Sequence, residues 1–478
     1  MSHLYLLGVA TLTLTSAGFA GSDTNADLQA RLEAAETRIA ELSAATNNNW
    51  LNDARADEIR GLVHDVLADA DTRASLQGSG ATAGYNGGFT IGSADGNWSM
   101  KINGLLQERW IDNSIDPAAG PSEDRRGFEN TRTVLNFSGT VASDYGYNVR
   151  LDWGAGVNGT PYVSTAAGGP AAATPNANGA DVQWAYGTVD LGDGWELAVG
   201  NMKLPTNREW MINAEYQLGV ERSLASQANL AAVAMAVAGG TGQPGVHNNT
   251  TGASLNYVGD EWRLWAMYGN GLGDAPNGVY SLNDQSHTWA VRAEFMLDGA
   301  DWGQFDQFTS VDGAASGCLI GVSYVRNNWG DNDATPAPNA QNDSNSLITV
   351  DGQCQFGGSN LYVAYNHNNI DGATGTGAGV LGYGDPTSFE VQYGIYLDSD
   401  WELYARYQDI DWDATGIDNS DSFTVGVNYY LSGQNAKWST DVSWADSGIA
   451  PGDNTTGWGV SAQTDDQTMI RTQLQFHF

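Results

Sequence analysis

The chain has 478 residues and a formal net charge of −36 at pH 7, which argues against a nucleic-acid partner because the phosphates would be repelled. With 60 glycines, 17 tryptophans and 20 tyrosines, the composition favours an all-β protein. No stretch approaches the roughly 18 continuous apolar residues that a transmembrane helix needs. A membrane-spanning form of this chain would therefore have to be a closed β-barrel.

The first twenty residues predict a secretion signal. An apolar segment runs from Leu4 to Ala17, and the small residues Gly18 and Ala20 occupy the two cleavage positions. The three residues before the segment lack the usual Lys or Arg. We predict a signal peptide over residues 1–20. Two cysteines in so long a chain fit an oxidising compartment.

Residues 21–87 change to helical patterning. Five apolar residues are spaced 4-3-4-3, as in a short heptad seam: Leu28, Leu32, Ala35, Ile39 and Leu42. We predict a coiled coil within 21–50 that joins subunits; the alternative is a single solvated helix. An amphipathic helix over Asp53–Leu76 and a flexible linker over Gly78–Gly88 follow. Residues 51–87 should be periplasmic.

From Gly88 the period becomes two, and residues 88–478 are predicted to form an antiparallel transmembrane β-barrel of about 16 strands. The predicted strands are 98–110, 131–142, 145–153, 180–191, 195–203, 250–258, 261–271, 286–298, 317–328, 346–356, 359–368, 387–398, 400–411, 421–431, 436–446 and 467–478. The last strand alternates clearly, with Ile470, Leu474 and Phe478 on one face and Arg471 on the other. A final Phe resembles the assembly signal of outer-membrane barrels.

The connections alternate between short and long, which is the layout of short periplasmic turns and long external loops. Short ones include 143–144, 192–194 and 357–358; long ones include 111–130 and 204–249. The exception is 299–316, which should be short and is not. This parity predicts an outer-membrane location with both termini in the periplasm.

Inward polar residues predict a wet lumen, and the loop 204–249 is predicted to fold into it as the third external loop. Its apolar run, 230–238, is too short to span lipid; an external cap or a subunit contact is the alternative. Acids and bases facing each other across this constriction would set up a transverse field. The pore-lining and constriction candidates are Lys101, Arg109, Arg132, Arg150, Lys203, Arg208, Glu209, Glu215, Glu221, Arg222, Arg406 and Arg471.

The two cysteines lie on consecutive predicted strands. Pairing Asn328 with Leu347 places Cys318 opposite about residue 357, within a few positions of Cys354. We expect a stabilising disulfide between Cys318 and Cys354.

Several stretches resemble the phosphate-selective porin O and P family. Gly88–Gln107 is similar to its opening hairpin and Phe128–Gly139 to its arginine-containing second strand. Residues 199–205, followed by Glu221-Arg222-Ser223, resemble its segment leading into the constriction. The resemblance implies a porin whose lumen, in that family, is basic and selects phosphate. Here Glu209, Glu215 and Glu221 interrupt the basic run, so the anion preference is not carried over.

The sequence shows no catalytic constellation, and we expect no enzyme activity, cofactor or metal. Asp411–Ser422 matches a calcium-binding loop only in part, and a solvated turn fits it better. The function predicted is a passive porin for small hydrophilic solutes or ions, and the oligomer expected is a homotrimer. Two alternatives remain: a barrel that anchors the outer membrane to the cell wall through its N-terminal helices, and a soluble secreted glycan-binding β-protein.

Overall fold

The computed structural model describes residues 22–44, 81–116, 122–154, 181–226, 249–270, 287–299, 301–328, 344–371, 385–413, 419–446, 457–458 and 466–478. They belong to two compact units, Met1–Ser79 and Gly80–Phe478. Three predictions lie outside the described residues: the signal peptide, the helix over Asp53–Leu76 and the apolar run 230–238.

The first unit contains helix α2, Ser22–Ala44, which covers the predicted heptad residues. Leu32 and Ile39 expose 51% and 66% of their surface, so the helix buries neither against its own chain. A helix is confirmed within 21–50, whereas the coiled coil stays a prediction. Among the described residues, no helix is long and apolar enough to cross a membrane.

The second unit begins with a hairpin of β1, Ala81–Tyr85, and β2, Phe89–Ser93. The structure differs here from the predicted linker, because Ala81–Tyr85 pairs along its whole length with β2. The small residues of β1 gave no alternating pattern by which to recognise a strand. β2 in turn pairs with the start of the first barrel strand.

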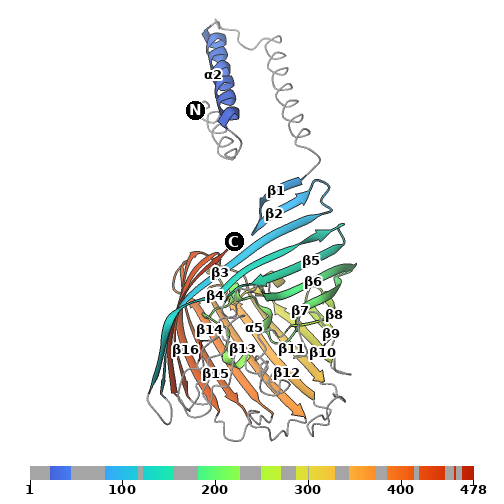
Figure 1. Ribbon diagram of the computed structural model, residues 1–478, viewed down its shortest axis with the longest axis vertical. Helices are drawn as coiled ribbons and strands as arrows, with labels where there is room; N and C mark the ends of the chain where they lie inside the picture. Colours follow the sequence, from blue (N-terminus) through green and yellow to red (C-terminus); the bar gives the residue numbers. More distant parts are fainter. Residues whose placement is uncertain are drawn as a thin grey trace. The chain divides into compact units, whose positions relative to one another are not determined.

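Within the described residues, sixteen further strands close into an antiparallel barrel, since β3 pairs with both β4 and β18 (Figure 1). The strands are β3 (Ser99–Asp116), β4 (Glu123–Val141), β5 (Tyr145–Asp152), β6 (Asp181–Gly192), β7 (Trp195–Lys203), β8 (Asn249–Val258), β9 (Trp262–Asn270), β10 (His287–Asp298), β11 (Ser316–Asn328), β12 (Ser344–Phe356), β13 (Ser359–Asp371), β14 (Thr387–Tyr396), β15 (Trp401–Asp411), β16 (Ser420–Ser432), β17 (Ala436–Asp446) and β18 (Asp466–His477). The predicted all-β barrel is confirmed.

One hairpin is longer than predicted. β3 and β4 continue through residues 111–116 and 123–130, which were expected to be loop. Polar cross-strand pairs hold this extension: Arg126 lies 3.4 Å from Asp112, and Ser114 Oγ donates to Asp124 Oδ1 at 2.8 Å. Polar residues outnumber the three large apolar ones of the extension, Ile111, Ile115 and Phe128. The apolar alternation used for the prediction therefore stops before the strands do.

The two faces of the barrel wall differ in chemistry. On β18, Ile470, Leu474 and Phe476 are exposed outward, while Arg471, Gln473 and Gln475 are buried inside. Large apolar side chains are also exposed on nearly all of the remaining barrel strands. The barrel therefore has an apolar outer belt around a polar interior, which is the pattern of a barrel placed in lipid.

The disulfide prediction is confirmed. Cys318 on β11 lies directly opposite Cys354 on β12, with 4.1 Å between the Cα atoms and a bond between the sulfurs. The predicted register was wrong by three residues, since Asn328 pairs with Ser344 rather than Leu347. β12 begins with Ser344 and Asn345, polar residues that the sequence pattern assigned to a loop.

Candidate functional site

The chain enters the barrel interior directly after β7. Residues 204–226, the inner loop, carry helix α5, Arg208–Met211, and the 3-10 helix η2, Ala214–Tyr216. Asn207 caps α5 by accepting a hydrogen bond from Trp210 N at 2.7 Å, which is a favoured start for a helix. Most inner-loop residues are buried. The described part of the predicted third loop thus lies inside the barrel.

Lys203, the last residue of β7, forms hydrogen bonds to the inner loop. Its ammonium donates to Trp210 O at 3.2 Å, Met211 O at 3.3 Å and Asn213 Oδ1 at 2.9 Å. An ammonium carries three donors, so all three are used. Lys203 therefore holds the inner loop in place at the edge of the cavity that it lines.

Ion pairs tie the inner loop to the barrel wall. Arg150 donates to both carboxylate oxygens of Glu215, at 3.2 and 3.1 Å. Arg132 donates to Glu221 Oε1 at 2.8 Å. A transverse field between separated charges was expected here; instead the opposite charges are in direct contact, because the loop packs against the wall.

These contacts fix the charge state of the loop's acids. Burial alone would raise the pKa of Glu215, but the adjacent Arg150 guanidinium outweighs it and lowers the pKa to about 2. Burial would likewise raise the pKa of Glu221, but the adjacent Arg132 guanidinium outweighs it and lowers the pKa to about 2. Both loop acids are therefore ionised at neutral pH, and both pairs persist there.

A second charge cluster holds α5 against β10 and β12. Arg208 Nη1 donates to Glu294 Oε1 at 3.2 Å, and its backbone N donates to Asp351 Oδ2 at 2.9 Å. Arg292 bridges the same two acids, 2.8 Å from Glu294 and 2.7 Å from Asp351. Arg263 adds a contact of 2.7 Å to Glu294. Asp306 of the connection 299–316 lies 3.5 Å from Arg263 and 3.6 Å from Arg208, so two buried acids and one exposed acid face three guanidinium groups.

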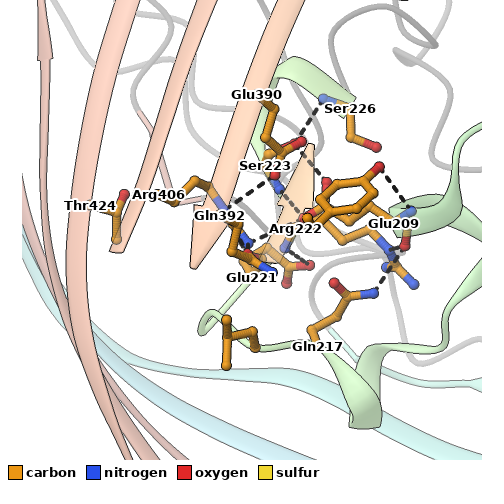
Figure 2. Close-up of polar contacts among 12 residues, drawn as sticks. Glu209, Gln217, Glu221, Arg222, Ser223, Ser226, Glu390, Gln392, Arg406 and Thr424 are labelled. Atoms are coloured by element: carbon orange, nitrogen blue, oxygen red, sulfur yellow. Dashed lines mark hydrogen bonds and ion pairs between the residues drawn. The ribbon is translucent and has the colours of Figure 1, made fainter. Parts of the chain in front are cut away.

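A third cluster joins the inner loop to β14 and β15 (Figure 2). Arg406 Nη2 donates to Glu209 Oε1 at 3.1 Å, and Ser223 Oγ lies 2.6 Å from both Glu209 Oε2 and Glu390 Oε2. Arg406 also donates to Glu221 O at 2.8 Å. The wall residues here come from neighbouring strands, and the loop residues from both ends of the inner loop.

The long connection 299–316 also folds inward. Its residues 301–315, the inner turn, contain the 3-10 helix η3, Trp302–Asp306. Phe308 N donates to Tyr216 O at 3.3 Å, its ring lies 4.8 Å from that of Tyr362, and Arg208 Nη2 donates to Phe305 O. This explains the exception in loop length: the extra residues pack against the inner loop inside the barrel.

Two cavities lie on the inner side of β3–β9. The cavities, of about 340 and 210 Å³, share the lining residues Asn148, Trp184 and Asn213. Lys101 lines the smaller one and Glu196 the larger. On the β10–β17 side, by contrast, inward side chains such as Thr349 and Gln392 have no exposed surface. We call these two parts the open half and the packed half of the lumen.

All twelve predicted charged residues lie on the inner face or the inner loop, but most are engaged in contacts with the protein itself. Arg109 pairs with Glu129, Arg471 with Asp441 at 2.7 Å, and Arg222 donates to Ile212 O at 2.7 Å. Sequence reasoning missed six partners on inward positions: Arg263, Arg292, Glu294, Asp351, Glu390 and Asp441. The alternation of the strands could have placed each of them inside.

The partial calcium motif extends beyond the described residues, which include only its two ends, 411–413 and 419–422. Asp411 Oδ1 accepts from Asp413 N at 3.0 Å, and Asp413 Oδ2 accepts from Asp385 N at 2.9 Å. Within the part of the chain that the structure describes, no three His, Cys, Asp or Glu side chains converge as metal ligands.

Comparison with known proteins supports the fold. No protein-family model matches the chain, and no curated protein matches its sequence. The anion-selective porin from Comamonas acidovorans is similar in structure, with a TM-score of 0.51 over 80% of this chain and 100% of that one at 13% identity. The chain has a porin-type barrel fold.

Two further solved structures are less similar. The outer membrane protein OmpT of Vibrio cholerae, in its trimer form, gives a TM-score of 0.47 at 12% identity, over 79% of this chain and 99% of that one. The outer membrane channel DcaP of Acinetobacter baumannii gives 0.46 at 9% identity, over 80% and 98%. At these scores neither likeness bears on the function.

Proposed function

We propose that the chain is an outer-membrane porin through which small hydrophilic solutes or ions diffuse passively. The observation that carries the proposal is the chemistry of the closed barrel: an apolar outer belt surrounds an interior lined with polar and charged side chains. A soluble glycan-binding protein would have no reason to expose such a belt. The porin-type fold supports the same conclusion.

The solute path runs through the open half of the lumen. The inner loop packs against β10–β17 on one side, together with the inner turn, and lines the two cavities beside β3–β9 on the other. The inner loop narrows this path. Four of the twelve predicted charged residues line the two cavities: Lys101, Arg150, Lys203 and Glu215. Paired charges leave a weaker field than separated ones, so pore width sets selectivity together with uncharged polar groups such as the lining asparagines.

The orientation follows from the two ends of the barrel. The short turns, the β1–β2 hairpin and Phe478 share one end, which we assign to the periplasm; the long connections then face outward. Phe478 N and O pair with Gly104, so the final residue belongs to the wall. The signal peptide over residues 1–20 and the assembly role of Phe478 belong to this proposal.

The N-terminal unit supports a second role. Leu32 and Ile39 are exposed on α2, as expected if the helix joins those of two further subunits in a homotrimer. Contact with the cell wall through residues 21–76 is the alternative use of this segment. Deleting residues 22–79 distinguishes the coiled coil from the cell-wall anchor. Loss of the trimer with unchanged cell-wall binding supports the coiled coil. Loss of cell-wall binding with an unchanged trimer supports the anchor.

Planar-bilayer recording of the purified full chain tests the porin function. We expect stepwise current increases as single barrels insert, because each barrel that conducts through the open half adds one ion path. The matched control is the detergent buffer carried through the same purification from cells without the gene. Folded barrels that insert without current steps would contradict the porin and leave the anchoring function.

A further inference from the structure

One hydroxyl group joins two carboxyl groups in the cluster between the inner loop and the wall (Figure 2). Ser223 Oγ lies 2.6 Å from Glu209 Oε2 and 2.6 Å from Glu390 Oε2. It also accepts a hydrogen bond from Ser226 N at 2.9 Å. The side chains of Ser223, Glu209 and Glu390 have no exposed surface, so water does not take part.

The hydrogens in this arrangement can be counted. A hydroxyl group has one hydrogen to donate and two lone pairs to accept with. Ser226 N uses one lone pair of Ser223 Oγ, and the single hydroxyl hydrogen serves only one carboxyl group. The other carboxyl oxygen, also at 2.6 Å, must itself donate a hydrogen to the second lone pair. One of the two acids is therefore neutral.

The surroundings identify which one. Glu209 Oε1 accepts from Ser223 N at 2.9 Å and from Arg406 Nη2 at 3.1 Å, as an ionised carboxylate requires. Within the described residues, Glu390 Oε1 has no hydrogen-bond partner, and Arg406 Nε lies 3.4 Å away. A buried anionic oxygen without a donor is costly, whereas the carbonyl oxygen of a neutral acid tolerates it.

The charges around the two acids also indicate that only one of the acids is ionised. Arg406 on β15 is the guanidinium in contact with both acids, and it balances one negative charge. The other charged or titratable groups around the pair are engaged elsewhere. Glu221 pairs with Arg132, Arg222 donates to Glu209 O, Asp351 on β12 pairs with Arg292, and Tyr362 OH on β13 accepts from Glu209 N at 3.3 Å.

We infer that Glu390 is a neutral carboxylic acid that donates to Ser223 and thereby positions the inner loop against the wall. It is a positioning residue, since it acts on the solute path only through the inner loop. Its effect on conductance rests on the proposed porin function, but its protonation state does not.

Alkaline solution removes the shared hydrogen. Two negative charges then face each other across Ser223 with one guanidinium between them, and the hydroxyl can bind only one of them. The contact between Ser223 and β14 is lost, and the end of the inner loop moves away from the wall. Conductance through the open half therefore changes at alkaline pH.

Single-channel conductance of the full chain from neutral to alkaline pH tests this inference. The wild type is expected to show an alkaline change in conductance and current noise. Glu390→Gln is expected to match the wild type at neutral pH and to lose the alkaline change, because its amide still donates to Ser223 without titrating. The matched control, Glu402→Gln, alters another fully buried wall acid away from Ser223 and should keep the wild-type response. Identical alkaline responses in wild type and Glu390→Gln would overturn the inference.

Infrared difference spectra between the wild type and Glu390→Gln at neutral pH give an independent answer. A carbonyl band of a neutral carboxylic acid, present in the wild type and lost in the variant, supports the inference. Carboxylate bands alone would overturn it. A barrel that gives this band but conducts no current would contradict the porin function and leave the role of Glu390 intact.

Discussion

Both halves of the lumen are lined with polar and charged side chains, but one half is filled and the other contains cavities. In the packed half, acids and bases from the inner loop and β10–β17 form closed networks such as Arg292 with Glu294 and Asp351. In the open half, cavities lie between asparagines, tryptophans and Lys101. The difference shows that charge on an inner wall does not by itself mark a solute path. What matters is whether an inward segment covers it.

The largest effect is expected from the inner turn. Replacing residues 302–313 with two glycines removes one of the two segments that fill the packed half, and conductance should rise on the order of twofold as a second path opens. Single-channel recording measures the change. A two-glycine insertion after Ser399, in an exposed turn at the same end, serves as the control and should leave conductance unchanged. An unchanged conductance in the shortened variant would mean that the packed half is already conducting.

A smaller change removes one charge from the packed half. Arg292→Ala leaves Asp351 and Glu294 with less compensation in a buried site, which costs about 3–5 kcal/mol of unfolding free energy. Urea unfolding of the barrel in lipid vesicles, followed by tryptophan fluorescence, measures the loss. Arg126→Ala breaks an exposed pair with Asp112 and should cost about 0–1 kcal/mol. Equal losses would show that the packed half is hydrated.

The smallest effect is expected from acid. The pKa values of Glu215 and Glu221 lie at about 2, below their ordinary value of 4.5, so their pairs stabilise the inner loop above pH 4.5. That contribution is lost as pH falls from about 4.5 through about 2, and the current should become noisier there. The double variant Glu215→Gln/Glu221→Gln should be noisy already at neutral pH. A wild-type current as quiet at about pH 2 as at neutral pH would contradict these pairings.

The sequence predicts the wall far better than the contents of the lumen. Alternation depends on neighbouring residues, so it located the strands and placed Arg471 inside and Ile470 outside. It failed where large apolar residues are sparse, as in the extension of β3 and β4. It could not pair Arg208 with Glu294 or Ser223 with Glu390, because these contacts join residues far apart in the chain. The inner turn was visible only as a connection of unexpected length.

Cysteine accessibility during bilayer recording tests most directly whether solutes pass through the open half. Asn148→Cys places a thiol between the two cavities, and Thr349→Cys places one on the buried inner face of β12. The native cysteines form a disulfide and do not react. A bulky, water-soluble thiol reagent should block the current of Asn148→Cys and leave that of Thr349→Cys unchanged. Block of Thr349→Cys, with Asn148→Cys unaffected, would contradict a solute path through the open half.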